Sequence, residues 1–174
     1  MNQKKLVFLD ETWAKTNMTR LYGRAPVGER LVDHTPHAHW INVTYVCGLK
    51  HNGVIAPYAF VGSMNKQRFL DYLRRHLLPA LGRGDILVMD NLASHKGQDV
   101  EQLLASVGAK VLYLPAYSPD LNPVEPSFSK LKTILRKQKI RDVEKLKRFL
   151  KRSPKFFTPT ECRNYFKYCG YRIC

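Results

Sequence analysis

Several common catalytic and targeting motifs are missing from this sequence of 174 residues. It contains no CxxC pair, no GxSxG, no P-loop and no HExxH, and no long apolar run opens it. These absences argue against a structural zinc site, a serine hydrolase, a P-loop nucleotide hydrolase, a zinc protease and a signal peptide. We therefore expect a soluble intracellular protein, and the length suits one domain with its own core.

Cysteine is scarce and its spacing is irregular. We expect free thiols rather than a disulfide framework or ligand set, because a chain of this size can build a hydrophobic core without crosslinks. The four cysteines are Cys47, Cys162, Cys169 and Cys174.

Acidic residues are also few, with 14 Asp and Glu against 29 Lys and Arg, which gives a formal net charge of +15. Twelve of the basic residues lie between Lys130 and Lys155, where only two acids occur. Such an excess favours a polyanionic partner, most simply nucleic acid, with an anionic membrane surface as the alternative.

The hydrophobic pattern predicts an α/β domain with a mixed five-stranded sheet flanked by helices. An Asn-Gly pair at 52–53 indicates an antiparallel hairpin between the second and third strands, and later strands alternate with helices. We expect the first strand to lie between the second and the fourth. The expected strands span about 6–9, 39–50, 54–61, 85–90 and 111–114, and the expected helices 65–81, 96–108, 123–139, 142–152 and 159–169.

Two of the expected strands end in the same way. Four apolar residues precede Asp10, and four precede Asp90. An aspartate there is costly unless it is paired or bound to metal, but the carboxyl ends of parallel strands are where α/β sheets build their sites. If the strands are neighbours, the two carboxylates converge. Each aspartate alone could equally cap a turn.

Glu125 is the third candidate carboxylate. Asn122 is a good helix N-cap and Pro123 suits the first helical position, so Glu125 falls in the first turn of the helix. It could simply complement the helix dipole. Lys132 and Arg136 share its helix face within about 20°, whereas Lys130 lies roughly 140° away. We expect the first two to contact a DNA backbone beside the site.

Three carboxylates suit a hard divalent cation such as Mg²⁺ or Mn²⁺. Two such ions about 4 Å apart can activate a nucleophile and stabilise the leaving oxygen in phosphoryl transfer. We therefore predict that Asp10, Asp90 and Glu125 are both metal ligands and catalytic residues, with two ions bound.

Three segments in this order resemble the catalytic domain of the mariner-like DDE transposases, especially their bacterial insertion-sequence branch. They are LDET at 9–12, MDNLASH at 89–95 and LPAYSPDLNPVE at 114–125. The 34 residues between Asp90 and Glu125 match the family's hallmark separation. The resemblance runs from residue 5 to about residue 140, and its last segment is the most specific.

The resemblance implies a ribonuclease H-like core over about 5–140, with residues 141–174 as a basic helical extension. It implies hydrolytic cutting at transposon ends, followed by attack of the freed 3′-hydroxyl on target DNA, in an active complex that is a homo-oligomer. It carries the metal-ligand role onto the three carboxylates. His95 matches a histidine for which a catalytic role beside the metal is one interpretation, and a helix-start hydrogen bond is the other. The expected location is the bacterial cytoplasm, with the nucleoid.

The family's N-terminal helix-turn-helix region, which recognises transposon ends, has no counterpart before the first strand. The sequence thus fits a catalytic fragment, a second reading frame joined to an upstream one, or a decayed copy. Two rival functions use the same residues: a ribonuclease H-like nuclease without strand transfer, and an inactive transposase-derived DNA-binding module. We expect Glu11 to point away from Asp10, and Trp13 and Trp40 to be core or hairpin residues.

Overall fold

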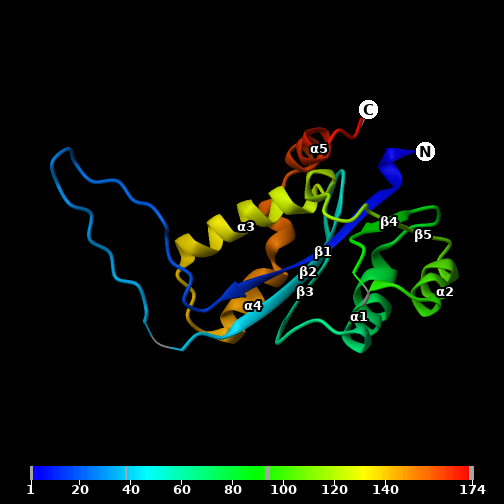
Figure 1. Cartoon of the computed structure of the whole chain (residues 1–174), viewed down its shortest axis with the longest axis horizontal. Helices are drawn as coiled ribbons and strands as arrows, with labels where there is room; N and C mark the ends of the chain where they lie inside the picture. The colour runs from blue at the N-terminus through cyan, green and yellow to red at the C-terminus, as the bar shows by residue number, and fades with distance from the viewer. Residues whose placement is uncertain (1, 38, 93–94, 173–174) are drawn as a thin grey trace.

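A computed structural model of the chain describes residues 2–37, 39–92 and 95–172. Its centre is one five-stranded sheet with the strand order β3-β2-β1-β4-β5 (Figure 1). β1 pairs with β2 in antiparallel and with β4 in parallel orientation, so the predicted mixed sheet with a central first strand is confirmed. The strands span Leu6–Lys15 (β1), Asn42–Lys50 (β2), Gly53–Val61 (β3), Ile86–Met89 (β4) and Lys110–Tyr113 (β5).

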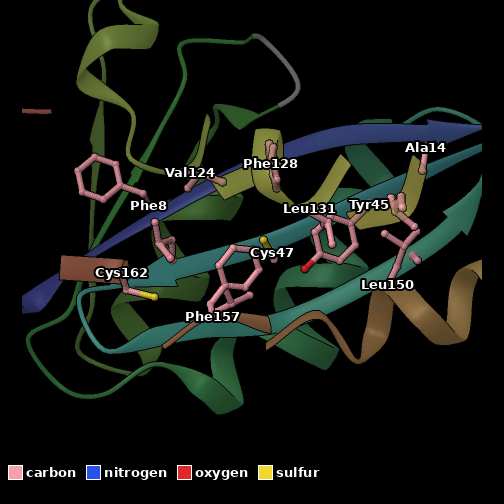
Figure 2. Packing of buried hydrophobic residues seen from close by; sticks show 14 of the residues in the cluster. Phe8, Ala14, Tyr45, Cys47, Val124, Phe128, Leu131, Leu150, Phe157 and Cys162 are labelled. Atoms are coloured by element: carbon pink, nitrogen blue, oxygen red, sulfur yellow. The ribbon is translucent and has the colours of Figure 1, made fainter. Parts of the chain in front are cut away.

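The helices α3 (Val124–Gln138), α4 (Val143–Lys151) and α5 (Pro159–Tyr168) belong to one layer of the fold. Their apolar side chains pack with alternate residues of β1 and β2, such as Phe8 and Tyr45, in a single buried cluster (Figure 2). Phe128 of α3, Leu150 of α4 and Phe166 of α5 all belong to this cluster. The two C-terminal helices therefore share their core with the sheet.

The opposite face of the sheet is covered by α1 (Lys66–Tyr72) and α2 (Gln98–Ser106). The regular helix expected over 65–81 was only partly right, because α1 continues as a π-helical turn at Leu73–Leu77 and a 3-10 turn at Leu78–Ala80. Pro79 accounts for the change, since it has no N–H to donate to the carbonyl four residues earlier and its ring crowds that turn.

A long loop, residues 16–41, joins β1 to β2 and projects beyond the rest of the molecule (Figure 1). Its base is held by Arg141, whose guanidinium donates to the carbonyl oxygens of Thr16 and Met18 at 2.8 Å each. The loop begins and ends near two tryptophans that were expected to be core or hairpin residues. They are not core residues, because Trp13 is 53% exposed and Trp40 is 50% exposed, but Trp13 does lie in the antiparallel pair of β1 and β2.

Buried polar groups in the described residues are mostly paired. Asp85, at the start of β4, is 3% exposed and accepts from Lys50 Nζ at 2.7 Å and from the Gly82 amide at 2.8 Å. The cysteines Cys47, Cys162 and Cys169 are buried free thiols, as expected, and Cys174 lies outside the described residues. None of the helices described here is long and apolar enough to span a membrane.

Candidate active site

The parallel pairing of β1 with β4 brings Asp10 and Asp90 to the same end of the sheet. Their last paired residues are Phe8 and Val88, and each aspartate follows two residues later. Both carboxylates therefore stand at the same level, where the parallel pairing of β1 with β4 ends. This is the edge where parallel sheets place their functional groups. Asp90 follows the end of β4, but β1 continues past Asp10 to Lys15, so the expectation that the first strand ends at Asp10 was wrong.

The Asp10 carboxylate is half-buried and already accepts two hydrogen bonds. The Glu11 amide donates to Oδ1 and the Asn122 side-chain Nδ2 donates to Oδ2, each at 2.7 Å. The pKa of Asp10 is raised from its ordinary 3.8 to about 7, mainly by burial; the charges of Glu125 and Asp90 also raise it, whereas the two hydrogen bonds lower it. A bound cation would offset both the cost of burying this charge and the repulsion from Glu125 and Asp90.

Asn122 is a site residue that the sequence indicated only as a helix cap. It is 5% exposed, and its Oδ1 accepts from the Val124 amide at 3.3 Å while its Nδ2 donates to Asp10. Its own carbonyl accepts from the Glu125 amide at 3.1 Å. One buried amide thus links Asp10 to the start of the helix that carries Glu125. The position of Asn122, three residues before Glu125, was the sequence signal for its contact with the start of the helix. Its hydrogen bond to Asp10 depends on the fold.

Glu125 lies in the first turn of α3, where its side chain is exposed. It lines a cavity of about 430 Å³ together with Asp10 and Asp90, and the loop at residues 114–119 closes another side of that cavity. The structure therefore brings the three predicted carboxylates to one cavity. In the described part of the chain, no three His, Cys, Asp or Glu side chains stand close enough together to hold a metal ion in their present positions.

His95 lies behind Asp90 and is not among the residues that line the cavity. It is 3% exposed, its Nδ1 lies 2.6 Å from Asp90 Oδ1, and its ring packs on Phe69 with the centroids 4.5 Å apart. Its carbonyl also accepts from the Tyr113 hydroxyl at 3.1 Å. Because a carboxylate accepts hydrogen bonds, Nδ1 is assigned as the donor. These contacts are those of a residue that positions Asp90.

Glu11 faces the other side of β1 from Asp10, as alternation predicts, but it is not remote from the site. Burial raises the pKa of its carboxyl, with His95 opposing and Asp90 adding to the effect. Its Oε2 is buried and has no hydrogen-bond partner among the described residues. Glu11 is therefore a further acidic group near Asp90, outside the three carboxylates predicted as ligands.

Two basic residues of α3, Lys132 and Lys130, lie in different surroundings, in keeping with their separation on the helix wheel. Lys132 is half-buried; burial lowers the pKa of its ammonium, whereas the charges of Glu125 and Asp10 raise it. Lys130 points elsewhere and bonds Glu161 Oε1 at 2.5 Å and the Phe156 carbonyl at 2.6 Å. The site therefore has Lys132 beside its carboxylates, while Lys130 ties α3 to the C-terminal segment.

Known structures share this arrangement of elements. The chain is similar to a Mos1 strand transfer complex (TM-score 0.73, 21% identity) and to a Mos1 transposase paired-end complex with the left transposon end (TM-score 0.71, 20% identity). The match to the strand transfer complex includes 97% of this chain and 51% of the Mos1 chain. The match to the paired-end complex includes 96% of this chain and 52% of the Mos1 chain. This chain is also similar to the Mos1 mariner transposase catalytic domain (TM-score 0.61, 20% identity), with 97% of this chain and 76% of that one covered.

The chain thus spans about half the length of the transposase chains in those complexes. At these identities the likeness establishes the fold, which is the ribonuclease H-like fold expected from the sequence. A comparison with curated protein sequences finds no match. A family model described as "DDE superfamily endonuclease" matches residues 5–147, which is most of the sequence. The chain therefore belongs to the DDE superfamily of endonucleases.

Proposed function

We propose that this chain is the catalytic domain of a DDE transposase, which cuts DNA at transposon ends and joins the freed ends to target DNA. The observation that carries the proposal is the cavity shared by Asp10, Asp90 and Glu125, at the point where the parallel pairing of β1 with β4 ends. Family membership and the matched complexes, which contain a transposon end or represent strand transfer, support it.

The proposed cofactor is Mg²⁺ or Mn²⁺, with two ions in the active complex. An all-oxygen set of carboxylates fits such hard cations, and two of the Mos1 paired-end complexes are described with Mg and with Mn. When bound, the ions would activate the attacking oxygen and stabilise the leaving oxygen. Asp10, Asp90 and Glu125 would hold them; this needs inward rotation of side chains, for which the exposed Glu125 has the most freedom.

The remaining residues of the site would hold these ligands in place. Asn122 keeps Oδ2 of Asp10 oriented, and His95 fixes Asp90 by donating from Nδ1. Such neighbours set the orientation and basicity of metal ligands. The role proposed for His95 is therefore to position a ligand rather than to touch the reacting atoms.

The proposed partner is DNA, both transposon ends and target, with a homo-oligomer as the active assembly. Lys132 and Arg136 would contact phosphates beside the metal site, because Lys132 is close enough to Asp10 and Glu125 to interact with their charges. A helix-turn-helix segment, upstream or on a separate chain, would supply recognition of the ends. For these 174 residues assayed on their own, we expect poor sequence specificity and binding dominated by phosphate contacts.

The test is to incubate the protein with Mn²⁺ and end-labelled duplex DNA and to resolve the products by size. A transposase gives nicked strands and also longer, joined strands when a free 3′-hydroxyl end is supplied. Nicking without joining would support the nuclease alternative. Neither product, with DNA binding intact, would support the inactive module. Glu101→Ala, which removes an exposed acid on α2, is the matched control for the three carboxylate variants.

A further inference from the structure

The chain turns back sharply at the end of α5. Gly170, with φ +85°, follows the helix cap, and its amide donates to the Lys167 carbonyl at 3.0 Å. The amide of Tyr171 donates to the Phe166 carbonyl at 2.9 Å. These two hydrogen bonds form a Schellman motif, in which a left-handed residue, usually glycine, lets the next side chain fold back onto the helix. The Gly-Tyr pair therefore determines where Tyr171 lies.

The Tyr171 ring packs beside the strand that carries Asp10. It meets Phe166 edge-to-face with the ring centroids 5.9 Å apart, and it meets Phe8 with the centroids 5.0 Å apart. Phe8 and Asp10 lie two residues apart on β1, so their side chains project to the same face of the strand. α5 also lies beside α3, the helix that carries Glu125 (Figure 1). The end of α5 is therefore next to the elements that build the proposed site.

The Tyr171 hydroxyl holds the turn that precedes α3. It donates to the Leu121 carbonyl at 2.8 Å, across 50 positions of the chain. This carbonyl belongs to the same peptide group as the Asn122 amide, which donates to the Pro119 carbonyl at 3.0 Å. Because a peptide group is planar, hydrogen bonds on its two opposite edges fix its orientation. The side chain of Asn122 therefore starts from a fixed backbone.

Asn122 carries this constraint to Asp10. Its Nδ2 donates to Asp10 Oδ2 at 2.7 Å, and its Oδ1 accepts from the Val124 amide at 3.3 Å, so both ends of its amide are held. Asn122 is 5% exposed, which leaves water little access to these bonds. An unbroken series of hydrogen bonds therefore leads from Tyr171 through the peptide group of residues 121–122 to the carboxylate.

We propose that Tyr171 is a positioning residue of the active site, whose hydroxyl holds the Asn122 peptide group so that the Asn122 side chain orients Asp10 as a metal ligand. The inference rests on the proposed function, because it concerns the residues that would hold the metal. The competing role for Tyr171 is to complete the core, to which its ring contacts contribute. The hydroxyl separates the two roles, because a phenylalanine ring fills the same space without it.

Tyr171→Phe tests the proposal, since it removes the hydroxyl and keeps the ring. The first measurement is the solvent exchange of the Asn122 side-chain amide protons, followed by NMR in EDTA, where no metal takes part; Asn122→Ala identifies their signal. We expect exchange to be about 2- to 10-fold faster in Tyr171→Phe, the range for one neutral hydrogen bond. Tyr168→Phe is the matched control, because Tyr168 is a tyrosine of α5 that is 82% exposed, and it should exchange as the wild type does.

The second measurement is the affinity for Mn²⁺, determined by calorimetry in a double-mutant cycle. Tyr171→Phe should weaken Mn²⁺ binding about 2- to 10-fold in the wild-type background. In the Asn122→Ala background the same change should have no further effect, because the residue through which Tyr171 acts is then missing. A role in core packing alone would act equally in both backgrounds. Thermal unfolding of each variant shows that it is folded.

Unchanged Asn122 exchange in folded Tyr171→Phe, wild-type Mn²⁺ affinity in that variant, or an equal loss of affinity in both backgrounds would each overturn the proposal. The exchange measurement keeps the test valid if Asn122→Ala does not fold, because it compares Tyr171→Phe with the wild type alone. Absence of Mn²⁺ binding by the wild type would refute the proposed function and with it the ligand role of Asp10. Faster exchange in Tyr171→Phe would still establish that the hydroxyl positions Asn122.

Discussion

Replacing Asp10 by asparagine should stabilise the metal-free protein above neutral pH. The pKa of Asp10 is raised from 3.8 to about 7, chiefly by burial. A carboxyl whose folded pKa lies above its unfolded value contributes stability that is fully present below the unfolded pKa and is lost as the pH rises through the folded pKa. The loss in the wild type falls between about pH 4 and pH 7 and amounts to about 4 kcal/mol at most.

The asparagine does not ionise, so the variant avoids this loss of stability, but only in part. The Asp10 oxygens face two donors, the Glu11 amide and Asn122 Nδ2. An amide at residue 10 offers one oxygen and one NH₂ group, so one hydrogen bond is lost at a cost of about 1–2 kcal/mol. The net gain expected at pH 8 is about 2 kcal/mol, or a rise in Tm of roughly 4–8 °C.

The assay is thermal unfolding in EDTA at pH 4 and pH 8 for wild type, Asp10→Asn and Asp120→Asn. Asp120 is an exposed aspartate next to the cavity loop and serves as the control. The gain for Asp10→Asn should appear at pH 8 and disappear or reverse at pH 4. Added Mg²⁺ should raise the Tm of the wild type more than that of the variant. An equal effect at both pH values would refute the electrostatic reasoning.

Three further outcomes follow from individual contacts. Asn122→Ala should weaken Mn²⁺ binding about 10- to 100-fold by freeing Asp10, and unchanged binding by calorimetry would contradict this. Lys132→Ala should weaken DNA binding and reduce the salt slope by about one, whereas Lys130→Ala should lower Tm without changing that slope; equal slopes in a salt titration would argue against the assignment. Asp85→Ala should cost about 3–5 kcal/mol in urea unfolding, since it leaves Lys50 unpaired, and a loss under about 1 kcal/mol would count against a stabilising role.

The sheet order and the meeting of two carboxylates were predictable because they follow from local signals. A run of four apolar residues ending in aspartate occurs twice, and the Asn-Gly turn predicts the hairpin of β2 and β3. β1 is central because it pairs with β2 on one side and with β4 on the other. The helix wheel of α3 likewise separates Lys132 from Lys130, because rotation along a regular helix depends only on residue number.

The features that the sequence left undetermined depend on contacts between distant segments. Asn122 reaches Asp10 across 112 positions in the chain, and no periodicity encodes that bond. The exposure of Trp13 depends on where α1 stops covering the sheet, which hydrophobicity alone misjudged because tryptophan is usually buried. The π-helical turn after α1 was missed because the leucine spacing of 65–81 fits a regular helix, whereas Pro79 acts on the turn before it.

The central claim is that Asp10, Asp90 and Glu125 hold metal together, and Mn²⁺ binding to the DNA-free chain tests it most directly. Calorimetric titrations compare the wild type with an alanine variant at each position and with Asp120→Ala as the control. Each of the three variants should bind Mn²⁺ at least about ten-fold more weakly, while the control should bind as the wild type does. Binding at wild-type affinity by any of the three folded variants would contradict a shared site.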